Sequence, residues 1–191
     1  MNAYSFYLYG SPFFWFSMLF PQRWLPYLMV PLLVLKFGVA GGGAYLYLKR
    51  YVKNWDYAVL GACLYALSGF AVYNVFFNHF VDVVALFPYL LWALDEAMYN
   101  KRHGLFAFWA AVNLLNNYFF FAGQVVFLAI YFVCKLTTGD YRLTVKRFVQ
   151  LAFESLLGVA MGCLLLIPAV LSLLQNPRTI DLASGWGFLT Y

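Results

Sequence analysis

Long runs of apolar residues, separated by short polar and basic segments, make up most of the chain. A helix that crosses a lipid bilayer needs about 20 consecutive residues that are mostly apolar. The runs that approach this length predict spanning helices over residues 25–48, 57–76, 83–99 and 149–174, and a longer run covers 105–136. This pattern predicts an all-α fold, a polytopic transmembrane helical bundle with about five to six membrane-spanning segments.

The stretch over 105–136 is apolar at both ends but polar in the middle, around Asn116, Asn117 and Gln124. Two arrangements compete, a single long tilted helix or a hairpin of two short helices over 105–117 and 119–136. Basic residues flank both ends of the stretch, and a single crossing would place them on opposite sides of the membrane. Because basic residues collect on the cytoplasmic side, we favour the hairpin.

The two ends of the chain differ from these spans. Residues 4–20 are apolar and aromatic, but Gly10, Ser11 and Pro12 interrupt them. Proline breaks a helix, so we expect this stretch to be an interfacial or re-entrant segment. Residues 175–191 are more polar and form a predicted outer tail, so that residues 1–191 make a single transmembrane domain.

Composition supports the membrane class and excludes a soluble globular domain. Of the 191 residues, 65% are hydrophobic and only 10% are charged, whereas soluble domains carry about 25% charged residues. The net charge of +5 does not indicate a nucleic-acid partner, because the basic residues lie between apolar runs, where they set topology.

Nine of the twelve basic residues fall on one side in the hairpin arrangement, and we assign that side to the cytoplasm. These nine are Lys49, Arg50, Lys53, Lys101, Arg102, Lys135, Arg142, Lys146 and Arg147.

Cysteines and glycines have no predicted chemical role. Cys63, Cys134 and Cys163 lie inside apolar runs without metal-ligand spacing, so we expect buried small side chains, no metal site and no cofactor. The small residues over 38–44 and the GxxxG pattern over 158–162 predict close packing between helices.

A set of polar residues gathers on the predicted outer side and suggests a binding site for a polar ligand. Its members are Asn78, His79 and Asp82 between two spans, Asn116, Asn117, Tyr118 and Gln124 at the hairpin tip, and Arg178 and Asp181 in the tail. His79 and Asp82 are three residues apart, so one helical turn would place them on the same face. The alternative is that Asp82 only caps a helix that starts at Val83 and that His79 is a solvated loop residue.

Other charged residues lie within or beside the predicted spans. Lys36 lies near the middle of the first span, and an ionisable residue inside a membrane suggests a functional role. Alternatively, Lys36 snorkels to the interface or pairs with a carboxylate in the bundle. Asp95, Glu96 and Glu154 lie beside basic clusters and are expected to form ion pairs.

Three stretches resemble the YfhO family of bacterial membrane proteins. They are LLVLKFGVAGGGAYLYLKRYV (32–52), AVLGACLYALSGFAVYNVFFNHFVDVVALFPYLLWALDEAM (58–98) and NNYFFFAGQVVFLAIYFV (116–133). The positions that carry the resemblance are Lys36, Gly38, Lys49, Arg50, Ser68, Gly69, Asp82, Pro88, Asp95, Asn117, Tyr118 and Phe119.

The resemblance implies part of a GT-C-type membrane glycosyltransferase in the bacterial cytoplasmic membrane. Such an enzyme transfers a sugar from a polyprenyl-phosphate carrier to a cell-envelope polymer of the lipoteichoic-acid type on the outer face. The acidic catalytic residue of GT-C enzymes would lie upstream of Met1, so we expect an incomplete member that needs the remainder of the protein or other membrane subunits.

The predicted substrate-binding residues under this hypothesis are Asn78, His79, Asp82, Asn117, Tyr118, Gln124 and Lys36. Two other functions remain open from the sequence. One is a transporter or flippase of a lipid-linked substrate, and the other is a non-catalytic membrane scaffold subunit.

Overall fold

The computed structural model describes residues 10–100, 102–139 and 144–174, and all regular structure in these ranges is helical. In chain order the elements are α2 (Pro12–Ser17), η2 (Gln22–Trp24), α3 (Leu25–Leu48), α4 (Trp55–Ala66), α5 (Gly69–Tyr73), η3 (Asn74–Phe76), α6 (Asn78–Tyr99), α7 (Leu105–Asn116), α8 (Tyr118–Thr137) and α9 (Val145–Leu174). The prediction of an all-α membrane bundle is confirmed. The expected tail over 175–191, with Arg178 and Asp181, lies outside the described residues.

Three stretches in the described part of the chain are long and apolar enough to cross a membrane: Gln22–Leu48, Trp55–Phe76 and Tyr118–Thr137. This number is lower than the about five to six spans expected. Helix α7 is apolar but shorter. Of the two other helices expected to span, α6 contains Asp82, Asp95 and Glu96, and α9 contains Lys146, Arg147 and Glu154 in its first third.

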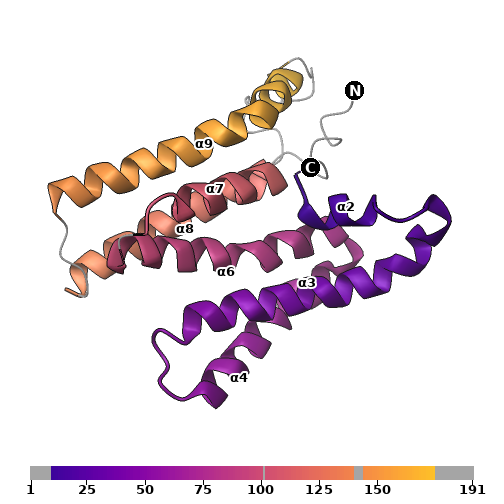
Figure 1. Ribbon diagram of the computed structural model, residues 1–191, viewed down its shortest axis with the longest axis horizontal. Coiled ribbons are helices and arrows are strands. Elements are labelled where there is room, and N and C mark those ends of the chain that lie inside the picture. Colours follow the sequence, from indigo (N-terminus) through magenta and orange to yellow (C-terminus); the bar gives the residue numbers. More distant parts are fainter. Residues whose placement is uncertain (1–9, 101, 140–143, 175–191) are drawn as a thin grey trace, which may run out of the picture.

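Helix α6 forms the centre of the bundle. It packs against α3 on one side and α7 on the other, while α4 packs on α3 and α9 packs on α7 (Figure 1). Most of the α6 residues from Val81 to Met98 are buried, including the charged side chains of Asp82, Asp95 and Glu96. Polar groups near both ends of α6 are therefore enclosed by other helices.

The two ends of the bundle differ in what they hold (Figure 1). One end, which we call the α2 end, holds α2 and the start of α6. The other, which we call the Arg50 end, holds the connections that follow α3 and α6. Helix α7 runs from the Arg50 end towards the α2 end, and α8 runs back, so the two helices form a hairpin.

The outer surfaces of the apolar helices are exposed rather than packed. Only 11% of the apolar window is buried in Gln22–Leu48, and the same share is buried in Tyr118–Thr137. Apolar faces of this size are costly in water and suit contact with lipid tails. Cys63 and Cys134 lie on such surfaces and are exposed, so the prediction that they are buried is wrong. An apolar run does not distinguish a face turned towards lipid from a face turned towards protein.

Two of the predicted apolar runs are interrupted. The run over 57–76 begins earlier, at Trp55, and α4 ends at Ala66, so that α5 and η3 complete it. The run over 105–136 breaks at Asn117, which has an extended backbone (φ −158°, ψ 100°). The Asn117 side-chain oxygen accepts hydrogen bonds from the backbone N–H groups of Phe119 and Phe120, each at 3.2 Å, and so caps α8.

Glycines allow α9 to lie directly on α7. A Cβ atom at Gly158 would lie 2.8 Å from the carbonyl oxygen of Ala107, and one at Gly162 would overlap the Leu114 side chain. The packing role predicted for the GxxxG pattern is confirmed, because these two glycines remove the atoms that would separate the helices.

Candidate functional site

Lys36 and Asp82 form a buried ion pair between α3 and α6. The Lys36 Nζ lies 2.5 Å from the Asp82 Oδ1, and the two residues are only 4% and 2% exposed. Helix α6 begins at Asn78, so Asp82 lies in its second turn, and the alternative that Asp82 caps a helix starting at Val83 is wrong. The structure shows the other alternative for Lys36, a pair with a carboxylate inside the bundle.

Ser11 and Asn78 complete this group, which we call the polar centre (Ser11, Lys36, Asn78 and Asp82). The Ser11 hydroxyl donates a hydrogen bond to Asp82 Oδ2 at 2.6 Å. The Lys36 ammonium donates to the side-chain oxygen of Asn78 at 2.6 Å and to its carbonyl oxygen at 3.1 Å. The Phe13 ring closes one side, with its centroid 5.5 Å from Lys36 Nζ.

Ser11 was not among the predicted site residues. It precedes Pro12 and is the N-cap of α2, where its side-chain oxygen accepts a hydrogen bond from the Phe14 N–H at 3.3 Å. A serine directly before a proline is a signal for a helix start. That signal predicts the cap, but the bond to Asp82 depends on where α2 lies in the fold.

Gly10 brings the start of α2 against the end of α7. A Cβ atom at this position would overlap the carbonyl group of Leu115 and lie 2.7 Å from the Asn116 nitrogen. The segment that carries Ser11 is therefore packed directly against the last turn of α7. This contact connects the polar centre with the buried amides of the hairpin.

Several of those amides have hydrogen-bonding groups that the described residues do not satisfy. Asn117 Nδ2, Gln124 Oε1 and Asn113 Oδ1 are buried and have no hydrogen-bond partner in the described part of the chain. Asn113 uses its Nδ2 to donate to the carbonyl oxygen of Trp109 at 2.9 Å. A buried polar group without a partner costs about 1–3 kcal/mol, so these amides are candidates for contact with a polar ligand.

The predicted site residues therefore divide into two groups. Direct contacts join Lys36, Asn78 and Asp82. His79 is half-buried and packs edge-on against Phe80, with ring centroids 4.3 Å apart. Tyr118 is also half-buried and packs against the apolar core, while Asn117 and Gln124 are buried on the α8 arm of the hairpin.

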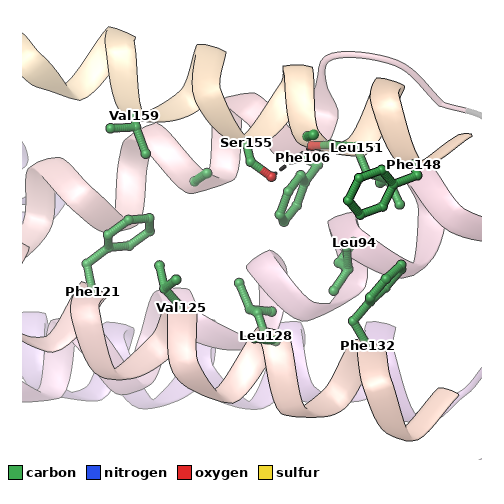
Figure 2. Close-up of a pocket in the computed structure, with 13 residues that line it drawn as sticks. Leu94, Phe106, Phe121, Val125, Leu128, Phe132, Phe148, Leu151, Ser155 and Val159 are labelled. Carbon is green, nitrogen blue, oxygen red and sulfur yellow. Dashed lines mark hydrogen bonds between the residues drawn. The ribbon is translucent and has the colours of Figure 1, made fainter. Parts of the chain in front are cut away.

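An apolar pocket of about 300 Å³ lies between α6, α7, α8 and α9 (Figure 2). Its lining includes Leu94, Phe106, Phe121, Val125, Leu128, Phe132, Phe148, Leu151 and Val159. Ser155 contributes the one hydroxyl labelled in Figure 2, and this hydroxyl donates to the Leu151 carbonyl oxygen at 2.8 Å. The chemistry of the pocket suits a hydrocarbon chain.

The sequence profile of the family described as "Bacterial membrane protein YfhO" matches residues 1–188. The chain belongs to the YfhO family. No curated protein and no solved structure matches it. Membership of YfhO and the three long apolar helices agree on a location in a membrane.

This YfhO protein carries a second charged cluster at the Arg50 end. Arg50 pairs with Glu96 through Nη2, and the Arg102 Nε lies 3.3 Å from the other oxygen of Glu96. His103 Nδ1 lies 3.6 Å from Glu154 Oε1. The predicted ion pair of Glu96 is confirmed, and Asp95 lies 3.9 Å from Arg50 Nη1. The contact of Glu154 with His103 is an ion pair only when the imidazole is protonated. The Arg50 pair joins the turn after α3 to α6, which are far apart in sequence.

Asp95 is buried beside this cluster and accepts hydrogen bonds from the hydroxyls of Tyr51 and Tyr131, the latter at 2.8 Å. Burial raises the pKa of the Tyr51 phenol above its usual range, and the hydrogen bond to Asp95 raises it further. Tyr51 therefore stays protonated and acts as a donor. Among the described residues, no group of three or more His, Cys, Asp or Glu is placed to hold a metal ion.

Proposed function

We propose that the chain contributes to an integral membrane glycosyltransferase of the GT-C type. In this proposal a sugar passes from a polyprenyl-phosphate carrier to a cell-envelope polymer of the lipoteichoic-acid type at the outer face of the bacterial cytoplasmic membrane. The observation that carries the proposal is the buried polar centre, in which Lys36 and Asp82 pair within a bundle of apolar helices.

Charged groups inside a membrane bundle are expensive and mark functional sites by default. Apolar residues of similar volume would stabilise the contact between α3 and α6 at least as well as an ion pair. The pair therefore needs a reason other than stability. Binding a hydroxyl-rich sugar is such a reason, because a carboxylate and buried amides supply the hydrogen bonds that sugar hydroxyls require.

The site residues have different roles in this proposal. Asp82 and His79 line the sugar or acceptor site, and Asn117, Tyr118 and Gln124 supply further hydrogen bonds. Lys36 is already bonded to Asp82 and Asn78, so it positions the carboxylate and balances its charge. The apolar pocket between α6 and α9 offers room for part of the carrier's hydrocarbon chain.

Sugar transfer in membranes from cells that produce the protein tests this proposal. The measurement is the transfer of labelled sugar from a polyprenyl-phosphate donor to the polymer, with wild type, Asp82→Asn and the control Asp56→Asn. Asp56 is an exposed carboxylate at the start of α4. We expect Asp82→Asn to reduce transfer about tenfold or more, the loss expected when a charged hydrogen bond is removed, and Asp56→Asn to retain it.

The double variant Lys36→Met/Asp82→Leu separates binding from folding, because it removes the ion pair without leaving one charge unpaired. A folded double variant without transfer activity supports the proposal. Full transfer in that variant removes the polar centre from the site. Uptake of the lipid-linked substrate into liposomes without a covalent product would support the transporter function instead. Sugar transfer that is unchanged in every variant would support the non-catalytic scaffold.

A further inference from the structure

A second pocket, of about 450 Å³, opens at the Arg50 end and differs in chemistry from the apolar pocket. Its lining consists of Arg50, Tyr51, Tyr99, Asn100 and Lys135. Two cations, one amide and two phenols surround it, and no carboxylate is part of the lining. This composition fits an anionic ligand.

Aromatic rings hold both cations at the pocket. The Lys135 Nζ lies 4.4 Å from the centroid of the Tyr51 ring, and the Arg50 Cζ lies 5.5 Å from that of Tyr99. Cation–π contacts of this kind fix a cation while leaving it able to attract an anion. The two positive charges come from different parts of the chain, Arg50 from the turn that follows α3 and Lys135 from the last turn of α8.

The neighbouring carboxylates do not cancel this positive charge. Glu96 is paired with Arg50 and Arg102 and accepts from the Asn100 amide, and Asp95 accepts from two tyrosine hydroxyls. Three cations, namely Arg50, Arg102 and Lys135, thus stand beside two carboxylates. The Arg50 Nη1 has no hydrogen-bond acceptor among the described residues. The Asp95 Oδ2 lies 3.9 Å from it, too far for a hydrogen bond.

The pocket lies where an apolar span ends. The span Gln22–Leu48 stops two residues before Arg50, and Lys135 is in the final turn of the span Tyr118–Thr137. Phospholipid headgroups occupy this depth of a bilayer, and basic pockets between transmembrane helices bind anionic headgroups. We propose that the pocket lined by Arg50, Asn100 and Lys135 binds the phosphate of an anionic phospholipid at the Arg50 end of the bundle.

Lipid titration of the purified chain, followed by native mass spectrometry, tests this site. Phosphatidylglycerol is the probe, phosphatidylcholine is the uncharged comparison, and inorganic phosphate is the soluble competitor. The test variant is Lys135→Gln, which removes one pocket cation without breaking the Arg50–Glu96 pair. The matched control is Lys49→Gln, which removes the same charge from an exposed residue at the same end that does not line the pocket.

We expect saturable binding of phosphatidylglycerol in preference to phosphatidylcholine. Lys135→Gln should weaken it about fivefold, the effect of one cation near a headgroup, while Lys49→Gln leaves it unchanged. Equal losses in the two variants would show bulk charge attraction and overturn the proposal. Binding of inorganic phosphate that depends on Lys135, without a preference for phosphatidylglycerol, would overturn the lipid assignment. The lipid titration does not measure sugar transfer, so its outcome is independent of the proposed function.

Discussion

At the scale of single residues, the Lys36–Asp82 pair is the feature that most needs an explanation. Both side chains are almost completely buried, and each depends on the other for its charge compensation. The polar centre adds a serine hydroxyl and an asparagine oxygen, so both charges also have hydrogen bonds. Removing one partner from such a pair is costly, whereas removing both together is not.

We predict that Lys36→Met lowers the free energy of unfolding by about 3–5 kcal/mol, because it leaves Asp82 as an unpaired buried charge. The double variant Lys36→Met/Asp82→Leu should recover most of this loss. Denaturation of the purified variants in detergent provides the measurement. If Lys36→Met has the stability of the wild type, the buried Asp82 does not need Lys36 to compensate its charge.

At the scale of elements, short polar and glycine positions decide how the helices meet. Asn117 ends α7 and caps α8, so one residue converts a long apolar run into a hairpin. Gly10 lets α2 reach that hairpin, and Gly158 lets α9 lie on α7. The α7–α9 contact also forms two walls of the apolar pocket, so its packing shapes the space available to a ligand.

We predict that Gly158→Ala destabilises the protein by about 1–3 kcal/mol, because the new methyl group would meet the Ala107 carbonyl oxygen and the Ala110 Cβ at 2.8 Å. Gly123→Ala is the matched control on α8, since a Cβ at that position has no neighbour within 4 Å. Alanine favours helix over glycine, so the control should be neutral or slightly stabilising. Thermal unfolding in detergent compares the two, and equal melting temperatures would contradict the prediction.

At the scale of the whole molecule, each end of the bundle holds a group of polar residues, and apolar helices lie between the two groups. The polar centre lies towards the α2 end, and the cluster of Arg50, Asp95 and Glu96 lies at the Arg50 end. The concentration of basic residues around Arg50 predicts that this end faces the cytoplasm. The proposed sugar site and the proposed lipid phosphate site would then face opposite leaflets.

We predict that Lys53→Cys and Phe76→Cys become labelled from opposite sides of the membrane, in a background where Cys63, Cys134 and Cys163 are replaced by alanine. Both positions are exposed, and the apolar stretch Trp55–Phe76 separates them. A membrane-impermeant maleimide added to intact cells should label Phe76→Cys, and Lys53→Cys should need permeabilised cells. Labelling of both from outside would contradict the orientation.

The sequence by itself determined the class of the protein and its most unusual residue. Apolar runs predict membrane helices because local composition decides whether a segment prefers lipid. Lys36 is conspicuous for the same reason, since its charge interrupts such a run. The break near Asn117 is also a local signal, because an asparagine that caps a helix acts on residues two and three positions further along the chain.

Only the tertiary structure decided which distant groups meet. Lys36 and Asp82 are 46 positions apart in sequence, and Ser11 bonds to Asp82 where Gly10 packs against the end of α7. Arg50 pairs with Glu96 on α6, and Cys63 and Cys134 lie on exposed faces rather than in the core. Helix periodicity fixes the spacing along one helix, but the rotation and contact of each helix against its neighbours depend on side chains from several helices packing at once.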